Sequence, residues 1–551
     1  MPTTAIANSA LHAISFLAGA MLLGGAPLAA EIPSSTDKAL TADKSASPTA
    51  DQEHFKPEEQ HSEGSVLVGG RKIDYSAVAG TLVVHAKGWD DVPQNADKDD
   101  KKRPAESSMF FAAYFAKNAN AGARPITFLF NGGPGSSTMW LHMGAFGPKR
   151  VVTADNTHTA AAPYRFINNE FSLLDVSDLV FIDAPGAGFS RISGKDKEKA
   201  FFGIDADAQA FANFIYQFLS KYARWNSPKF LFGESYGTAR NAVLINVLET
   251  EKLIDFNGVI NLSQILLWEA SPDGADINPG VELPYELALP SYAATARYHH
   301  LLPESSQTLP EFLETVEHFS LHEYATALAA GDKLEPAQRR AVAQRLHDYT
   351  GLPLAYIEKA NLRITGGEFE KTLKIDADLT VGRLDTRFSG PTMDPLSKEA
   401  DYDPQSAAIS SAYVTAINSY VRGDLKFGAD RVYKPNIYEV VDKVWNFQHQ
   451  PPGVSNPLPI TPNVTPDLAA AMKYNPRLKV MLNAGFYDLA TPFFQGVYEL
   501  AHLPIPAALR ANIEYKFYES GHMVYAHEAS FKALHDNVAD FIRRTANEAV
   551  N

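Results

Sequence analysis

The segment KFLFGESYG at residues 229–237 constrains the fold of this chain more than any other part of its sequence. Its apolar run at residues 230–232 is typical of a buried strand. The next five residues, GESYG, fit the pattern G-x-S-x-G, and TARNAVLINVLET at residues 238–250 reads as a helix. Strand, sharp glycine turn and helix are the context of a nucleophile elbow, which lifts a serine hydroxyl clear of the backbone. The segment therefore predicts Ser235 as a nucleophile; the alternative is a glycine-rich turn that carries a surface serine.

Apolar strands alternate with helices on both sides of this segment, which predicts an α/β protein with a mostly parallel central sheet and helices on both faces. Three earlier strands are of antiparallel type, at residues 65–70, 72–86 and 107–116. The other strands of the parallel part are expected at residues 125–130 and 178–183, within 256–271, and at 477–485 and 512–520.

The first 30 residues read as a secretory signal. Residues 13–30, AISFLAGAMLLGGAPLAA, form an apolar segment that ends in small residues, with cleavage expected near Ala29 or Ala30. The residues before it lack Lys and Arg, which departs from the usual signal pattern. We expect a periplasmic or secreted protein without a membrane span once the signal is removed. The alternative is a disordered or transmembrane N-terminus, although glycines and a proline interrupt this short segment.

The remaining chain divides by composition into four regions. Residues 31–63 are rich in small and charged residues and predict a disordered linker. Residues 64–284 and 441–551 are expected to form the first and second parts of one α/β core. Residues 285–440 are largely helical in pattern, so we expect an insertion that caps the sheet, with a hairpin at residues 372–390.

Charge and cysteine content narrow the classes of function. The formal net charge is −15 and no block of Lys or Arg occurs, which argues against nucleic acid as a partner. The chain has no cysteine, so thiol catalysis, disulfides and Cys-ligated zinc are excluded. His318 and His322 are four residues apart on a predicted helix, but no third ligand supports a metal site there. We expect no cofactor, and composition leaves the oligomeric state open.

A serine hydroxyl becomes a good nucleophile only when a base takes its proton and a third group orients that base. Asp488 and His522 each follow the end of one of the last two expected strands, at the sheet edge where such folds place their sites. The order Ser235, Asp488, His522 is that of α/β hydrolases. Asp488 has a turn-forming role as its alternative, and His502 and His527 compete with His522 as the base.

The segment NGGPGSS at residues 131–137 predicts an oxyanion-binding loop. A tetrahedral intermediate needs fixed N–H donors for its negative oxygen, and a glycine-rich loop lets the backbone approach a substrate closely. Gly133 N–H and Tyr236 N–H are the candidate donors, because Pro134 has no N–H. The alternative is an ordinary turn between a strand and a helix.

Five segments taken together resemble the serine carboxypeptidase family, most closely its bacterial branch. They are FLFNGGPGSS, FIDAPGAGFSR, FLFGESYGTAR, NAGFYDLATP and YESGHMV, in this order within residues 125–275 and 475–545. The resemblance implies an α/β-hydrolase fold and a catalytic triad of Ser235, Asp488 and His522. It also implies the release of C-terminal residues from peptides through an acyl-enzyme.

The resemblance further implies a set of substrate-binding residues. Asn131 and Glu234 match positions that hold the C-terminal carboxylate of the peptide, and Glu234 can donate to it only while it keeps its proton. Gly132, beside Asn131, is also predicted to bind the substrate. The family's third carboxylate-binding residue, a Glu, is replaced here by Ala145. Met523 matches a position near the leaving-group pocket, with core packing as its alternative.

These observations predict an exported serine carboxypeptidase that acts on peptide substrates. The main alternative is an esterase or acyltransferase on the same scaffold, because the triad accepts esters as well as amides. The replacement of the third Glu by Ala145 gives that alternative its weight. A binding protein on a hydrolase fold is a further alternative, but that class usually lacks a member of the triad, and all three members are present here.

Overall fold

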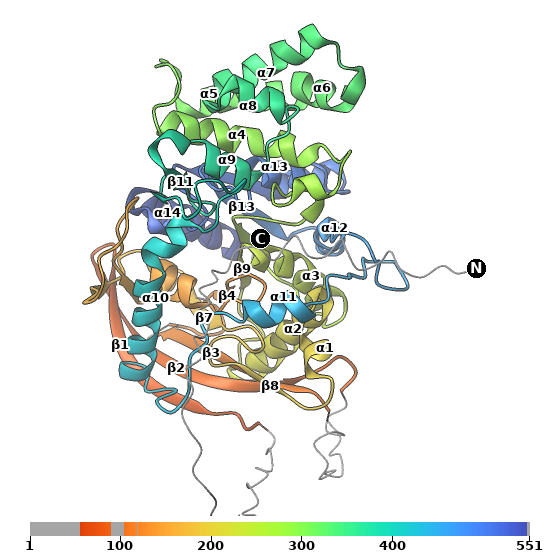
Figure 1. Ribbon diagram of the computed structural model, residues 1–551. Helices are drawn as coiled ribbons and strands as arrows, with labels where there is room; N and C mark the ends of the chain where they lie inside the picture. The colour runs from red at the N-terminus through yellow and green to blue at the C-terminus, as the bar shows by residue number, and fades with distance from the viewer. Residues whose placement is uncertain (1–54, 90–103, 118, 548–551) are drawn as a thin grey trace, which may run out of the picture.

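The structure is a computed structural model that describes residues 55–89, 104–117 and 119–547 (Figure 1). The predicted signal peptide and most of the predicted linker lie outside the described residues. Within the described part, none of the helices combines the length and the apolar character that crossing a membrane requires.

One sheet of ten strands runs through the molecule, in the order β1-β2-β3-β7-β4-β9-β10-β13-β14, with β8 paired to β3. All neighbouring pairs from β7 to β14 are parallel, whereas β1, β2 and β3 pair antiparallel. The strands of this sheet are β1 (Glu59–Val68), β2 (Arg71–His85), β3 (Glu106–Ala116), β4 (Ile126–Phe130), β7 (Asp178–Ile182), β8 (Arg191–Ser193), β9 (Lys229–Glu234), β10 (Gly258–Leu262), β13 (Lys479–Gly485) and β14 (Ile513–Tyr518).

Two small antiparallel pairs and a set of helices complete the described structure. The pairs are β5 (Lys149–Val151) with β6 (Phe166–Asn168), and β11 (Leu379–Val381) with β12 (Ser389–Pro391). The helices are α1 (Lys197–Phe201), α2 (Ile204–Lys221), α3 (Tyr236–Thr250), α4 (Leu283–Tyr298), α5 (Leu309–Phe319), α6 (Ala325–Ala330), α7 (Pro336–Thr350), α8 (Leu354–Lys359), α9 (Gly366–Thr372), α10 (Pro404–Gly423), α11 (Tyr438–Val444), α12 (Thr465–Tyr474), α13 (Phe493–Ala501) and α14 (Glu528–Asn547).

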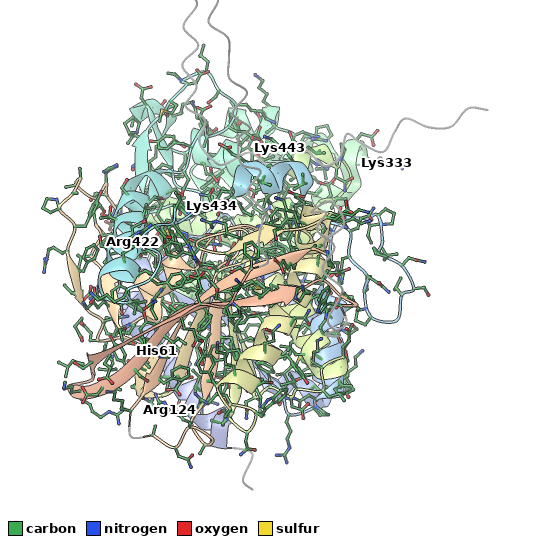
Figure 2. All side chains as sticks on the ribbon, turned by 90° about the horizontal axis from the view of Figure 1, so that it is seen from below. His61, Arg124, Lys333, Arg422, Lys434 and Lys443 are labelled. Atoms are coloured by element: carbon green, nitrogen blue, oxygen red, sulfur yellow. The ribbon has the colours of Figure 1, made fainter. Side chains whose placement is uncertain are left out.

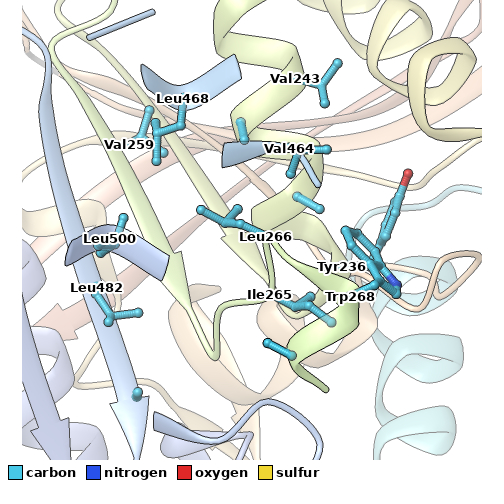
Figure 3. Packing of buried hydrophobic residues seen from close by; sticks show 14 of the residues in the cluster. Tyr236, Val243, Val259, Ile265, Leu266, Trp268, Val464, Leu468, Leu482 and Leu500 are labelled. Atoms are coloured by element: carbon cyan, nitrogen blue, oxygen red, sulfur yellow. The ribbon is translucent and has the colours of Figure 1, made fainter. Parts of the chain in front are cut away.

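The two faces of the sheet bury separate apolar clusters. Successive side chains of a strand point to opposite faces, so Phe128 and Phe130 join the cluster that includes α2 and α3, while Leu129 joins the cluster on the other face. Figure 3 shows the first cluster, where Val259 of β10 lies beside Leu468 of α12. The second cluster contains side chains of α10 and α14. A mostly parallel sheet covered on both faces confirms the predicted fold class.

The first strand begins earlier than the sequence indicates. The linker was predicted to extend to residue 63, but β1 starts at Glu59 and pairs with β2 from Glu59↔Gly80 onward, so that boundary is wrong. The first residues of β1 are polar and largely exposed because the strand lies at the edge of the sheet. Its backbone hydrogen bonds to β2 do not depend on apolar side chains, and the hydrophobic pattern therefore becomes visible only near Val66.

Most of residues 285–440 is helical. Helices α5, α6, α7 and α8 gather at one end of the molecule, away from β1, β2 and β3 (Figure 1). Helix α10 differs from them, because Ile409 and Tyr413 belong to the apolar cluster of the sheet itself. The expected hairpin at residues 372–390 forms as the short pair β11–β12. The boundaries at residues 284 and 440 stay predictions.

A buried histidine fixes the irregular chain that follows α11. His449 Nδ1 lies 2.5 Å from Asp205 Oδ1 at the start of α2, and Nε2 lies 2.7 Å from Asp467 Oδ2 of α12. Burial opposes the charged imidazole, but the hydrogen bonds to both carboxylates outweigh it and raise the pKa of His449 to about 9. Protonated His449 therefore ties the loop to two helices.

We expect this interaction to make stability depend on pH. The folded-state pKa lies above the unfolded value of about 6.5, so the stabilisation is complete below pH ~6.5 and is lost as pH rises through about 9. The thermal midpoint of the wild type should exceed that of His449→Gln at pH 6, and the difference should shrink by pH 9.5. The exposed His502 provides a control, since His502→Gln should show no such trend. A difference between wild type and His449→Gln that stays constant across this pH range would contradict the assignment.

Candidate active site

Ser235 occupies a sharp turn between β9 and α3. Strand β9 ends at Glu234 and α3 begins at Tyr236, which confirms the predicted strand–turn–helix arrangement. Ser235 has φ 60° and ψ −130°, a strained conformation for a residue with a side chain. Its N–H donates to Leu262 O at the end of β10 (3.0 Å). The strained turn leaves the side chain partly exposed beside the first turn of a helix.

Two glycines are needed for close backbone contacts around this turn. A Cβ at Gly233 would lie 2.1 Å from Gly237 O, across the turn. A Cβ at Gly132 would lie 2.4 Å from Tyr236 N, because the loop after β4 packs directly on the turn. Gly132 is buried in this contact. Its observed role is packing, and its predicted contact with a substrate stays a prediction.

The carboxyl end of β10 brings the other two predicted triad residues to Ser235. While Leu262 O accepts from the Ser235 N–H, the adjacent Ser263 Oγ donates to His522 O (2.7 Å). His522 Nδ1 lies 2.8 Å from Asp488 Oδ2. Within the described residues, no hydrogen bond joins Ser235 Oγ to His522. A hydrogen bond between a nucleophile and its base can form or tighten when the substrate binds.

Thr491 also takes part in this arrangement; it lies within the segment NAGFYDLATP but was not predicted as a site residue. Its hydroxyl donates to Asp488 Oδ2 (2.8 Å) and lies 3.2 Å from His522 Nδ1. The N–H groups of Ala490 and Thr491 donate to Asp488 Oδ1 at 2.8 and 3.0 Å. One carboxylate oxygen is thus held by the backbone, and the other faces the imidazole.

The charge of Asp488 governs the basicity of His522. Burial disfavours the imidazolium, but the Asp488 carboxylate and its hydrogen bond outweigh that effect and raise the pKa of His522 above its ordinary value. Glu234 acts in the same direction, and Arg383 acts against it. The competing histidines have other partners: His502 Nδ1 lies 2.8 Å from Tyr498 O, and His527 Nδ1 lies 2.9 Å from Ser530 Oγ.

Asn131 and Glu234 are hydrogen-bonded to each other. Asn131 Nδ2 donates to Glu234 Oε2 (3.0 Å), and the Tyr525 hydroxyl contacts both oxygens of Glu234, at 3.1 and 2.9 Å. Burial is the largest effect on this carboxyl group and raises the pKa of Glu234 to about 7, although both hydrogen bonds oppose it. Glu234 therefore changes its charge near neutral pH. Tyr525 was not identified from the sequence, because it lies almost 300 positions away from its partner.

Ala145 leaves no polar group at its position. It lies in a π-helical turn, Leu141–Phe146, all of whose residues are buried. Met523 is also buried, in the apolar cluster that contains α10 and α14. Its burial fits core packing, and its predicted place near the leaving-group pocket stays a prediction.

The two predicted oxyanion donors have free amides. Within the described residues, neither Gly133 N–H nor Tyr236 N–H donates a hydrogen bond, and Gly133 is exposed. Asp183, at the end of β7, shapes the loop by accepting from the Thr138 N–H (2.8 Å) and the Phe189 N–H (3.3 Å). Both amides are therefore available to a ligand.

The segment that leads into α11 covers this loop, an arrangement that the sequence did not indicate. Ser137 N–H donates to Pro435 O (2.9 Å), and Ile437 N–H donates to Gly135 O (2.9 Å). Figure 2 shows Lys434 and Lys443, which flank the contact, on this part of the chain. The half-buried Tyr438 follows directly, and its ring lies against Gly133.

The predicted pair His318 and His322 lies apart from these residues, at the end of α5. The rings stack with centroids 4.2 Å apart, and His322 Nδ1 lies 2.8 Å from His318 O. Among the described residues, no three His, Asp or Glu side chains lie together so that they could hold one metal ion.

Part of the chain is similar to known carboxypeptidases. Residues 97–285 match the family model described as serine carboxypeptidase. Serine carboxypeptidase-like 33 of Arabidopsis thaliana is 27% identical over 182 residues, which are 32% of this chain and 35% of that relative. The pheromone-processing carboxypeptidase KEX1 of Saccharomyces cerevisiae is 29% identical over 153 residues, which are 26% of this chain and 20% of that relative. The chain thus matches about a third or less of these relatives' length.

A solved structure extends the similarity of fold over most of the chain. The crystal structure of a shortened KEX1, a prohormone-processing carboxypeptidase from Saccharomyces cerevisiae, aligns with a TM-score of 0.50 and 16% identity. The alignment covers 85% of this chain and 91% of that chain, and it shows a shared fold. Over residues 97–285 the chain is thus similar to serine carboxypeptidases, and over most of its length it shares the fold of one of them.

Proposed function

We propose that this protein is a serine-type carboxypeptidase that removes the C-terminal residue of peptides through an acyl-enzyme on Ser235. The observation that carries the proposal is the hydrogen-bonded pair His522–Asp488, held by the end of β10 at the same sheet edge as Ser235. An orienting carboxylate, an imidazole and a serine on a nucleophile elbow are the parts that acyl transfer needs. The family match to serine carboxypeptidases supports peptides as the substrate class.

In the proposed reaction, Ser235 Oγ attacks the carbonyl carbon of the last peptide bond while His522 Nε2 takes its proton. The imidazolium then gives that proton to the leaving amino group, and Asp488 holds the ring through Nδ1. The negative oxygen of the intermediate accepts hydrogen bonds from Gly133 N–H and Tyr236 N–H. Water attacks the acyl-enzyme by the same proton transfers in reverse order and releases the shortened peptide.

Asn131 and Glu234 are proposed to bind the C-terminal carboxylate of the substrate. Asn131 supplies an amide N–H at every pH, whereas Glu234 can donate only when protonated. With a pKa raised to about 7, Glu234 keeps its proton in a mildly acidic medium. Loss of that proton puts a negative charge beside the substrate's own carboxylate, which weakens binding.

Two further points concern the alternative activity and the location of the enzyme. An esterase or acyltransferase on the same scaffold remains the alternative activity, although the family match favours the carboxypeptidase. Export to the periplasm or the medium is proposed from the apolar segment at residues 13–30 alone.

Ser235→Ala should abolish turnover without unfolding the protein. The loss in kcat should exceed about 10³-fold, because the nucleophile of a triad cannot be replaced by its partners. Hydrolysis of N-blocked dipeptides, together with labelling by a fluorophosphonate, measures the effect. Ser305→Ala, in an exposed loop between α4 and α5, is the matched control. Residual hydrolysis near the wild-type rate would remove Ser235 from the mechanism.

Binding of peptides with a free C-terminus should weaken as pH rises through about 7, the raised pKa of Glu234. The measurement is KM from pH 5 to pH 8.5. Glu234→Gln should flatten this dependence, because an amide donates at every pH. Peptides with an amidated C-terminus serve as the matched control and should show little dependence on this group. If the dependence persists in Glu234→Gln, another group is responsible for it.

Tyr525→Phe should shift the pH dependence of KM for free-acid peptides to higher pH. The Tyr525 hydroxyl favours the ionised form of Glu234, so its removal should raise the pKa of Glu234 further. The KM for free-acid peptides should therefore begin to rise at a higher pH than in the wild type. An unchanged profile would show that the hydroxyl does not control this proton.

A further inference from the structure

Arg383 lies beside two residues of the proposed triad, although it belongs to the mainly helical insertion. Its carbonyl oxygen accepts from Leu489 N–H (3.0 Å), the residue after Asp488. The next carbonyl, Leu384 O, accepts from His522 N–H (2.6 Å). The backbone of this loop between β11 and β12 is therefore fixed to both sides of the candidate active site.

The Arg383 side chain is held in place with one edge free. Nε and Nη2 both donate to the Asp273 carboxylate, the first at 3.1 Å. Within the described part of the chain, Nη1 has no hydrogen-bond partner, and the side chain is 21% exposed. A guanidinium in this state offers two N–H donors in a fixed direction at a small further cost in entropy.

A neighbouring arginine shows what a purely structural pair looks like in this loop. Arg387 also binds a carboxylate through Nε and Nη2, that of Asp385, but its Nη1 donates to Asp155 (3.1 Å) and its side chain is only 3% exposed. All of its edges have partners. Arg383 differs because the corresponding edge remains open.

The charge of Arg383 acts on the active site. It lowers the pKa of His522 against the larger effect of Asp488, and it is among the groups that act on the half-buried Tyr438. Glu370 also lies near it, and burial raises the pKa of Glu370 well above its usual range. The guanidinium donates its side-chain hydrogen bonds to Asp273 instead. Asp273 is thus the anion that orients the guanidinium.

We propose that Arg383 is a specificity-determining residue, whose free Nη1 edge binds a carboxylate of the peptide substrate. The inference rests on the proposed function and names the substrate feature that the insertion recognises. Arg383 would supply a donor for a carboxylate, which the side chain of Ala145 cannot do. A peptide can offer the carboxylate in two ways, as its C-terminal group or as an acidic side chain next to the scissile bond.

The test measures binding in the full chain carrying Ser235→Ala, so that bound peptides are not cleaved. Calorimetric titration compares an N-blocked dipeptide as free acid and as amide, and peptides ending in Glu and in Gln. In one of the two pairs, the ratio of the Kd of the amide peptide to the Kd of the carboxylate peptide should fall by about 10-fold or more in Arg383→Gln. A change in the first pair identifies the C-terminal carboxylate, and a change in the second pair identifies an acidic side chain.

Two further variants control the result. Arg340→Gln removes the same charge from α7, where the side chain is 75% exposed, and should leave both preferences unchanged. Arg383→Gln combined with Asp273→Asn removes the ion pair as a unit, and it should lose the preference without leaving a buried charge unpaired. The double variant keeps the test valid if the single variant is unstable.

The outcomes separate this inference from the proposed function. The inference is wrong if the Arg383 variants keep both preferences, for free acid over amide and for Glu over Gln. It is also wrong if no peptide binds to the Ser235→Ala chain that still carries Arg383. Equal weakening of acid and amide peptides would mean a structural role and would also overturn it. Turnover by the chain with Ser235 intact tests the proposed function independently, so carboxylate binding through Arg383 without hydrolysis would overturn the function alone.

Discussion

The carboxyl end of β10 holds the candidate active site together. Leu262 O accepts from Ser235 N–H, Ser263 N–H donates to Asn483 O (2.8 Å) in β13, and Ser263 Oγ donates to His522 O. Parallel strands bring their carboxyl ends to one edge of a sheet, and here one two-residue segment links three of them. A slip of one residue in the pairing of β10 would turn its side chains to the other face and separate these parts. The register of the central strands is therefore a condition for the site.

Two buried carboxyl groups in this site have different surroundings. Asp488 accepts from two backbone N–H groups and the Thr491 hydroxyl, and it faces His522. Among the described residues, the Glu234 side chain accepts from Asn131 and Tyr525 alone, and these hydrogen bonds do not offset its burial. Two carboxyl groups with such different hydrogen-bond partners are suited to different tasks. One carboxyl group orients a base, and the other exchanges a proton near neutral pH.

Local sequence patterns predicted the parts of the site that lie at strand ends. Ser235, Asp488 and His522 each follow an apolar run, and a run of that kind can be recognised without knowing its neighbours. The sheet and its helices could be predicted for the same reason. The start of β1 was missed because an edge strand needs only backbone partners, so its polar residues carry no apolar signal.

Other residues of the site could not be predicted because their roles depend on tertiary contacts. Thr491 and Tyr525 contact the triad and Glu234 through side chains whose local sequence is unremarkable. Arg383 and Tyr438 lie within residues 285–440, whose helical pattern says nothing about which loop touches the sheet. A periodic pattern reports which face of an element is buried, but it does not report what covers that face.

The contact between the loop after β4 and the segment before α11 has a consequence for how such an enzyme changes over evolutionary time. The N–H groups of Ser137 and Ile437 donate main-chain hydrogen bonds across this contact, to Pro435 O and Gly135 O. Such a joint tolerates substitution, because every residue except proline carries the same two groups. Exposed positions of the covering segment, such as Lys434 and Asn436, are therefore free to vary in sequence while the segment stays attached. New preferences for ligands can arise there by mutation without disturbing the atoms that react.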